Sequence, residues 1–438
     1  MFILYYIIFF IILIRLIKNF RQTVLWYIPF RIALHQGIIL WPQNPTVMLD
    51  SMVCFCIIII YYSQYRNKIP INKFPFTFPL LLFSISEFLS GFVASDNATI
   101  FNFLQTVVVD IGLVYVLWNC IVSEKDISRL IKGYTVMFSL AILLGIFEQI
   151  THYNPIISIE KALLPASAPH GLIWVSEGIR FGQLFRSQAF MSISITFGGY
   201  CVIYFIFYYY FSNKYRIYNY FRGKKQMFYI IGLAFGTILS GSKSPILTLI
   251  VSFIPYFKWK WMHNFKLIIL MLIVIPLTLP SFMRIYDDIY SSLTVENQWE
   301  YTGGSSLAMR MQQLEISYNA FLQSPIIGNG SKATADVAES NPELLGAESI
   351  WFKLLIEKGI VGIIAYFVLI MYPLFLRNSS NKKCYLALII SWMALNTMTT
   401  VPGMNISFYY TLIVILRKTE LFKYRSNSNA VINNYSSF

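Results

Sequence analysis

The chain has 438 residues, of which 57% are hydrophobic and 12% are charged. Because soluble domains carry about 25% charged residues, this composition excludes an ordinary soluble protein and indicates an integral membrane protein. The formal net charge is +14, but the basic residues are divided among the loops between apolar runs. This distribution predicts a membrane topology and argues against a nucleic-acid partner.

Apolar runs long enough to cross a hydrocarbon core of about 30 Å recur along the whole chain. They predict an all-α fold, a polytopic helical bundle of about 12 or 13 transmembrane helices with one large outer loop. No cleaved signal peptide is expected, because the first apolar run lacks a basic flank before it and a small-residue site after it. The expected spans are residues 2–17, 23–41, 46–62, 75–94, 100–122, 133–150, 189–211, 227–240, 244–257, 266–282, 349–375, 383–400 and 404–416.

Lys and Arg residues gather in every second loop, for example in 66–73, 125–132 and 214–225. Basic loops remain in the cytoplasm, so the segments between them are predicted to face the opposite side. These outer segments are 95–99, 151–188, 283–348 and 401–403. The C-terminus is then cytoplasmic, whereas the side of the N-terminus stays open.

This alternation divides the chain into six parts. They are N-terminal transmembrane helices (1–150), a first outer loop (151–188), central transmembrane helices (189–282), a large outer loop (283–348), C-terminal transmembrane helices (349–416) and a cytoplasmic tail (417–438).

The segment 283–348 is the longest polar part of the chain. An amphipathic helix is expected from Leu307 to Phe321, because Leu307, Met311, Leu314 and Tyr318 recur at helical spacing. The turn-forming stretch 323–330 then ends this helix. A loop of this length on a membrane protein usually covers a cavity or binds a head group.

Several motifs of common enzymes are missing from the sequence. The five cysteines form no CxxC pair, the four histidines form no HExxH, and no phosphate-binding P-loop is present. Disulfide, zinc and ATPase functions are therefore disfavoured, and neither a metal nor a cofactor is expected. If the protein is an enzyme, its substrate must already carry the energy for the reaction, as a lipid-linked pyrophosphate does.

Four cations lie at the outer ends of expected spans, where basic residues are otherwise sparse: Arg180, Arg186, Lys243 and Arg310. They are candidates for binding a pyrophosphate. An interfacial arginine can equally reach to lipid phosphate, and Arg310 can form a surface ion pair with Glu315 or another acid.

The turn around Lys243 has the composition of an anion site. Ser242 and Ser244 flank the lysine within LSGSKSP, between two expected spans. Small residues and a cation at the start of a helix favour anion binding.

Four blocks occur in an order that resembles the O-antigen ligase and polymerase superfamily of bacterial polysaccharide assembly. They are RFGQLFRSQAF from Arg180, LSGSKSP from Leu239, the segment from Arg310 to Gly330, and ESIWFKLLIEKGIVG from Glu348. Together they lie within residues 165–375. Ligases of the superfamily have His-Asn at the head of the last block, where this chain has Glu348 and Ser349. The resemblance therefore favours a Wzy-type polymerase over a ligase.

The resemblance implies an enzyme that joins oligosaccharide repeat units carried on undecaprenyl pyrophosphate, at the periplasmic face of the bacterial inner membrane. Lipid-linked donor and acceptor, the bilayer and a Wzz-type co-polymerase that sets chain length are the implied partners. Glu348 is the candidate base for the acceptor hydroxyl, with an ion pair or a helix-terminal carboxylate as the structural alternative. The other expected site residues are Arg180 and Arg310 as catalytic cations, and Lys243, Ser242, Ser244, Arg186, Trp351 and Ser349 as pyrophosphate or sugar ligands.

Two other functions remain open. One is an O-antigen ligase that transfers finished polymer to lipid A-core. The other is a polysaccharide flippase, for which Arg31, Asp50, Glu87, Asp110 and Glu148 in or near spans supply a conceivable path.

Overall fold

The computed structural model describes residues 3–34, 38–41, 47–64, 70–94, 103–104, 106–163, 179–180, 184–256, 307–344, 347–377, 379–399 and 406–435. The described part is almost entirely helical, and its strands form only two short hairpins, which confirms the predicted all-α membrane fold. The expected span 266–282 and the outer segments 95–99 and 401–403 lie outside the described residues.

Three helices among the described residues are long and apolar enough to cross a membrane. They are α7 (Glu124–Thr151), α9 (Ser194–Lys214) and the run Ile350–Phe375 that contains α16 (Ile350–Met371). Shorter apolar helices are α3 (Leu49–Gln64), α4 (Thr77–Val93) and the run Val107–Cys120, a π-helical turn that continues into α6 (Leu113–Cys120). The total of about 12 or 13 spans stays a prediction that rests on hydropathy.

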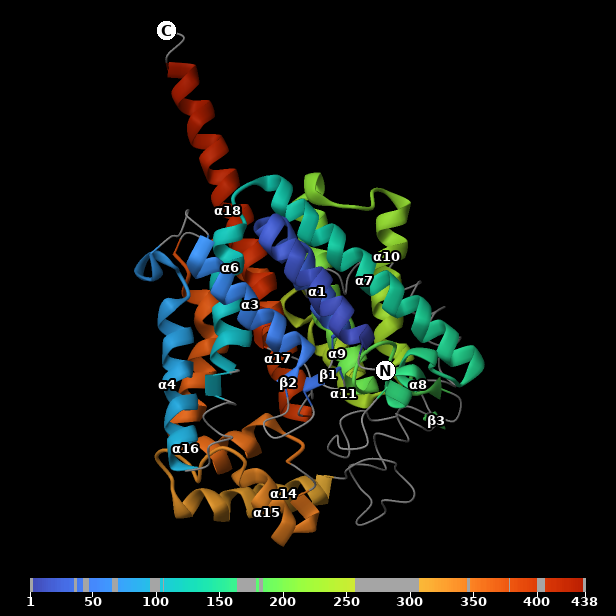
Figure 1. Ribbon diagram of the computed structural model, residues 1–438, viewed down its shortest axis with the longest axis vertical. Coiled ribbons are helices and arrows are strands. Elements are labelled where there is room, and N and C mark those ends of the chain that lie inside the picture. Colours follow the sequence, from blue (N-terminus) through green and yellow to red (C-terminus); the bar gives the residue numbers. More distant parts are fainter. Residues whose placement is uncertain are drawn as a thin grey trace, which may run out of the picture.

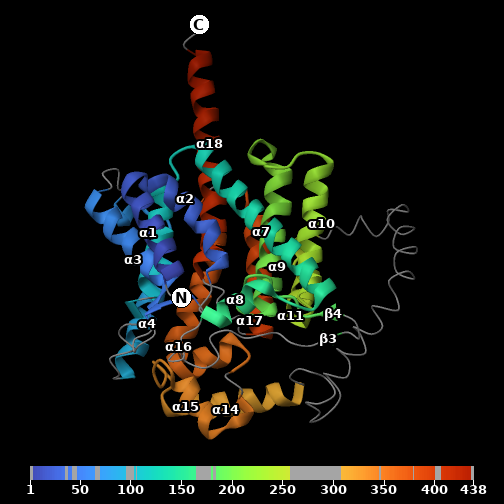
Figure 2. The same cartoon turned by 45° about the vertical axis from the view of Figure 1, so that its right-hand side comes forward.

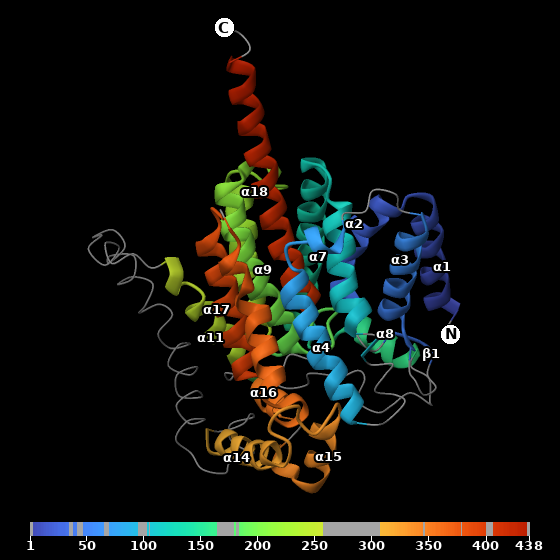
Figure 3. The same ribbon diagram turned by 90° about the vertical axis from the view of Figure 1, so that its left-hand side faces the viewer.

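The remaining helices complete the bundle (Figure 1). They are α1 (Ile3–Lys18), α2 (Phe20–Phe30), α8 (Pro155–Leu163), α10 (Lys224–Leu239), α11 (Lys243–Val251), α17 (Lys382–Met398) and α18 (Ile406–Tyr435). The hairpins are β1 (Ile39–Trp41) with β2 (Val47–Met48), and β3 (Ile179–Arg180) with β4 (Leu184–Phe185). The C-terminal half of α18 projects beyond one end of the bundle in all three views (Figures 1, 2 and 3).

Buried aromatic rings hold α7 against α9. Phe138 and Tyr204 stack with their ring centroids 4.4 Å apart and an interplanar angle of 6°. Both side chains are fully buried. Such a pair contributes about 0.5–1.5 kcal/mol beyond its buried area, and it adds a direct contact between two helices that both pack against α10.

A cap of two helices lies at the end of the bundle opposite the projecting C-terminus (Figures 2 and 3). The cap consists of α14 (Leu307–Gln323), α15 (Ala333–Ser340) and the turn Pro342–Leu344. It has a small core of its own, formed by Ala320, Ala333, Leu344, Ala347 and Ile356. The cap therefore covers the N-terminal end of α16.

The expected helix in the large loop is confirmed, but its expected apolar face was wrong. Met311, Leu314 and Tyr318 are 60%, 40% and 52% exposed, whereas Gln313 and Ser317 are fully buried. The buried positions of α14 are instead Met309, Gln313, Ser317 and Ala320. The buried face of α14 is thus set by its packing on the cap core and on α16, and it does not follow the hydrophobic periodicity.

Candidate functional site

The helix α16 is broken at Gly359. This residue has φ 56° and ψ −153°, a conformation that essentially only glycine adopts. The break frees backbone groups of α16, and the turn 325–330 pairs with them. The N–H groups of Asn329 and Gly330 donate to the carbonyls of Ile356 and Glu357, at 2.8 and 3.2 Å. The prolines and glycines of the third and fourth blocks therefore allow the turn 325–330 to form backbone hydrogen bonds with α16 at its break. We call this contact the joint.

The same joint bends α16. Trp351 and Tyr366 would be about 22 Å apart along a straight helix, yet their ring centroids are 5.8 Å apart. The arm that begins at Ile350 is thus folded toward the arm that follows Gly359. The run Ile350–Phe375 is consequently not one straight span, and Glu348 lies just before its first arm, on the side of the cap.

An ion pair joins the third and fourth sequence blocks. Nη2 of Arg310, on α14, lies 3.6 Å from Oε2 of Glu348. Their side chains are 33% and 29% exposed, so both are accessible from the cap side. The structure therefore brings together two residues that the sequence separates by a loop and a helix, and it realises the ion pair considered as the structural alternative.

The two other expected residues in the fourth block have structural contacts. Ser349 caps α16, and its hydroxyl accepts a hydrogen bond from the backbone N–H of Trp351 at 3.4 Å. Nε1 of Trp351 donates to Oγ1 of Thr397 on α17, at 2.8 Å. These contacts place the indole of Trp351 among the membrane helices, where it orients the first arm of α16.

The first and second blocks also meet, at the turn between α10 and α11. Gly241 has φ +57°, and Cγ of Arg186 lies 3.3 Å from the position that a Cβ of Gly241 would occupy. Lys243 follows two residues later as the first residue of α11. Arg186 and Lys243 are both partly exposed, so two cations share this turn.

The serines of the second block differ in their surroundings. Ser242 is 2% exposed, and its hydroxyl lies 3.2 Å from that of Ser194 at the start of α9. Ser244 is partly exposed on the first turn of α11. Ser242 therefore holds the turn against α9, and Ser244 is the hydroxyl beside Lys243 that remains accessible.

Arg180 is described through its backbone alone. It ends β3, where it pairs with Leu184 of β4. The hairpin carries Arg180 and Arg186 on either side of its turn. In Figures 1 and 2, β3 lies toward the end of the bundle at which α14 and α15 are found.

Two residues at the C-terminal end of α7 form hydrogen bonds with the loop around Arg186 (residues 185–189, here the Arg186 loop). The sequence did not indicate this role for either of them. The carboxylate of Glu148 accepts hydrogen bonds from the backbone N–H groups of Gln188 and Ala189, at 2.9 and 2.7 Å. The side-chain amide of Gln149 accepts from the N–H of Phe185 at 3.0 Å and donates to the carbonyl of the same residue. A buried acid at the end of a predicted span was the only available signal.

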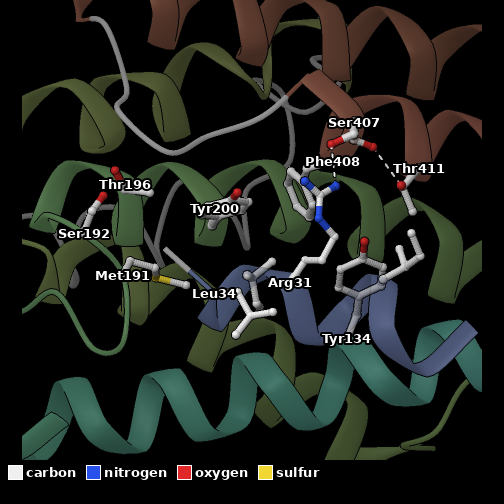
Figure 4. A pocket seen from close by; sticks show the side chains of 12 residues that line it. Arg31, Leu34, Tyr134, Met191, Ser192, Thr196, Tyr200, Ser407, Phe408 and Thr411 are labelled. Carbon is white, nitrogen blue, oxygen red and sulfur yellow. Dashed lines mark hydrogen bonds between the residues drawn. The ribbon is translucent and has the colours of Figure 1, made fainter. Parts of the chain in front are cut away.

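The other charged residues inside the bundle are engaged in local contacts. Arg31 donates to both oxygens of Asp50, at 2.8 and 2.7 Å, and to Oγ of Ser407, at 2.8 Å. Ser407 in turn donates to Asp110 at 3.1 Å. This network borders a cavity of about 30 Å³ (Figure 4), which has room for only one or two water molecules.

A second internal ion pair lies beside the break in α16. Lys358 pairs with Glu87 of α4, and the hydroxyl of Ser90 donates to the carbonyl of Glu357 at 2.8 Å. These contacts stabilise the broken helix against α4. Within the described ranges, no group of three or more His, Cys, Asp or Glu side chains is placed to hold a metal ion.

The described residues define a helical membrane protein in which the expected cations lie in two places: Arg310 contacts Glu348, and Arg186 lies beside the turn that precedes Lys243. The family model described as O-Antigen ligase matches residues 228–367. This range includes most of α10, all of α11 and the cap, and most of α16. The match supports the O-antigen ligase and polymerase superfamily, and with it a glycosyltransferase-like enzymatic role in a membrane, but it does not separate polymerase from ligase. A comparison with curated proteins gave no match.

Proposed function

We propose that this protein is a polymerase of lipid-linked oligosaccharide repeat units. It joins units carried on undecaprenyl pyrophosphate into O-antigen or a related surface polysaccharide and releases undecaprenyl pyrophosphate. The observation that carries the proposal is the Arg310–Glu348 contact of 3.6 Å. This contact places a carboxylate beside a guanidinium at the N-terminal end of a bent membrane helix, where a lipid-linked substrate can present its polar head.

In the proposed reaction, a hydroxyl of the acceptor sugar attacks the anomeric carbon of the donor. Glu348 takes the hydroxyl proton as the new carbon–oxygen bond forms, and the bond between the anomeric carbon and the pyrophosphate oxygen breaks. The leaving pyrophosphate remains on its lipid. General-base catalysis of this kind accelerates a reaction by about 10²- to 10⁴-fold.

Cations stabilise the charge that develops on the leaving group. Arg310 is one of them, and Arg180, Arg186 and Lys243 are the others on the same side of the bundle. One preorganised donor to a developing oxyanion is worth about 3–4 kcal/mol of barrier. Arginine also binds phosphate oxygens in a bidentate manner, which suits it better than lysine for a pyrophosphate.

A ligase is the second proposal, because the matched family model is described as O-Antigen ligase. Glu348 at the position where ligases of the superfamily have histidine favours the polymerase. A flippase is third. The internal charges Arg31 and Lys358 pair with Asp50 and Glu87, and such pairs support a structural role better than a transport path.

We further propose that the chain resides in the bacterial inner membrane, with the cap and the cations in the periplasm. The cytoplasm would then contain the loop 215–223 and the C-terminal tail 417–438. A Wzz-type co-polymerase remains a proposed partner, and the six-part domain division stays a proposal.

The test uses purified protein in lipid nanodiscs with undecaprenyl-pyrophosphate-linked repeat units. A polymerase forms a ladder of products from these units alone, whereas a ligase forms product only when a lipid A-core acceptor is added. Arg180→Ala and Lys243→Ala should abolish the ladder, and Lys243→Arg should keep it. Arg129→Ala is the control. Arg129 lies near the N-terminal end of α7, whereas Glu148 and Gln149, which bind the loop of Arg186, lie at its C-terminal end. A full ladder from both alanine variants would refute the pyrophosphate role of these cations.

A further inference from the structure

A groove is lined by the last turns of α9 and the first turns of α10. Figure 2 places these turns at the end of the bundle opposite the cap. Its volume is about 960 Å³. The walls are mainly apolar and include Ile217, Met227 and Ile231, which are 71%, 65% and 52% exposed. Exposed apolar walls at the end of a membrane helix suit hydrocarbon rather than water.

Two arginines line the same groove. Arg216 and Arg222 belong to the loop that joins α9 to α10, and both are exposed. None of the lining residues is acidic, and the sequence contains no Asp or Glu between Glu177 and Asp287. The groove therefore combines apolar walls with two exposed arginines and has no acidic residue in its lining.

The neighbouring lysine has a different role. Nζ of Lys214 donates to the carbonyl of Ser380 at 2.6 Å and to Oδ1 of Asn381 at 2.7 Å. It thereby ties α9 to the connection between α16 and α17. Lys224 and Lys225 are exposed on the first turn of α10 but do not line the groove. Of the basic residues from Lys214 to Lys225, only the two arginines therefore line the groove.

We infer that this groove binds an anionic phospholipid, independently of the reaction proposed above. The phosphate of the lipid lies between Arg216 and Arg222, and an acyl chain runs along Met227 and Ile231. Guanidinium groups match the oxygens of a phosphate in charge and geometry. Basic pockets beside membrane helices are a recurrent way of holding anionic head groups.

The experiment is native mass spectrometry of the full-length protein in detergent, titrated separately with phosphatidylglycerol and phosphatidylcholine. The wild-type protein should bind phosphatidylglycerol at least tenfold more tightly than phosphatidylcholine. The variant R216Q/R222Q should lose this preference. The matched variant K224Q/K225Q removes the same charge from the adjacent first turn of α10 and should keep it. Millimolar inorganic phosphate should not displace the lipid, because it lacks the acyl chain.

Three results would overturn the inference. They are equal binding of the two lipids by the wild-type protein, an equal loss of preference in both double variants, and displacement of the lipid by inorganic phosphate. The second would show an effect of net charge alone, and the third would show a simple anion site. Unchanged size-exclusion profiles establish that each variant is folded. The outcome does not depend on polymer formation, so it can fail while the proposed function holds.

Discussion

Arg310 of α14 and Glu348, directly before the N-cap of α16, form a partly exposed ion pair in which Nη2 and Oε2 are 3.6 Å apart. The pair connects the cap to the membrane helix beneath it. Exposed ion pairs contribute only about 0–1 kcal/mol to stability, so stability alone is a weak reason for it. The same two groups are well placed for acid–base and anion chemistry.

Exchanging the two charges separates these roles. The double variant R310E/E348R restores an ion pair in the reverse direction, so it should have a melting temperature close to that of the wild type. Polymer formation should nevertheless fall by at least 100-fold, because the base and the cation have changed places. Glu348→Gln alone should also be folded and inactive. Recovery of activity in the exchanged variant would assign the pair to structure.

The hydrogen bonds of Glu148 to Gln188 and Ala189 make the Arg186 loop depend on α7. Glu148→Gln replaces one acceptor oxygen by a donor, which then faces a backbone N–H. The loss of a buried hydrogen bond should lower the free energy of unfolding by about 1–3 kcal/mol, and polymer formation should fall with it. Thermal unfolding in detergent and the product ladder measure the two effects.

The control for Glu148 is Ile150→Ala, at a position that is 75% exposed on the same helix end. It should change neither property. Glu148→Asp should restore part of the activity, because it keeps the charge while shortening the side chain. If Glu148→Gln unfolds and reacts like the wild type, the loop is held by other contacts.

The break at Gly359 should not tolerate a side chain. An added Cβ would lie 2.6 Å from the carbonyl oxygen of Pro325, in a backbone conformation with φ +56°. Gly359→Ala should therefore destabilise the protein by about 3 kcal/mol or more and reduce its yield. Gly232→Ala is the matched control, because only Cδ1 of Ile142 lies within 4 Å of its Cβ position, at 3.9 Å. Comparable yields of the two variants would show that the joint is flexible.

The two ends of the bundle should lie on opposite sides of the membrane. Ala335 of the cap and Tyr220 of the loop between α9 and α10 are both exposed. With the native cysteines replaced, Ala335→Cys should react with a membrane-impermeant maleimide in cells whose outer barrier is opened. Tyr220→Cys should react only after the inner membrane is disrupted. Labelling of residue 220 in intact spheroplasts would reverse the assignment and move the proposed reaction to the other face.

Much of the helical fold can be predicted from hydropathy, and the order of the motif blocks indicates the class of protein. Apolar runs predict helices because a membrane-spanning backbone must satisfy its own hydrogen bonds. The expected spans 133–150, 189–211 and 349–375 correspond to α7, α9 and the run containing α16. The expected helix after Leu307 was also correct, since turn-forming residues end it clearly.

Tertiary structure decided what the blocks do. Periodicity predicted the wrong buried face of α14, because the burial of that helix depends on the cap core and α16, which are distant in sequence. No local pattern shows that Pro325–Gly330 enters the break at Gly359, or that Glu148 holds the loop of Arg186. Each of these contacts joins segments distant in sequence, and hydrogen-bond partners across such distances depend on packing. The sequence alone thus determined a helical membrane protein with cations on one side, and only the folded chain determined that Arg310 meets Glu348.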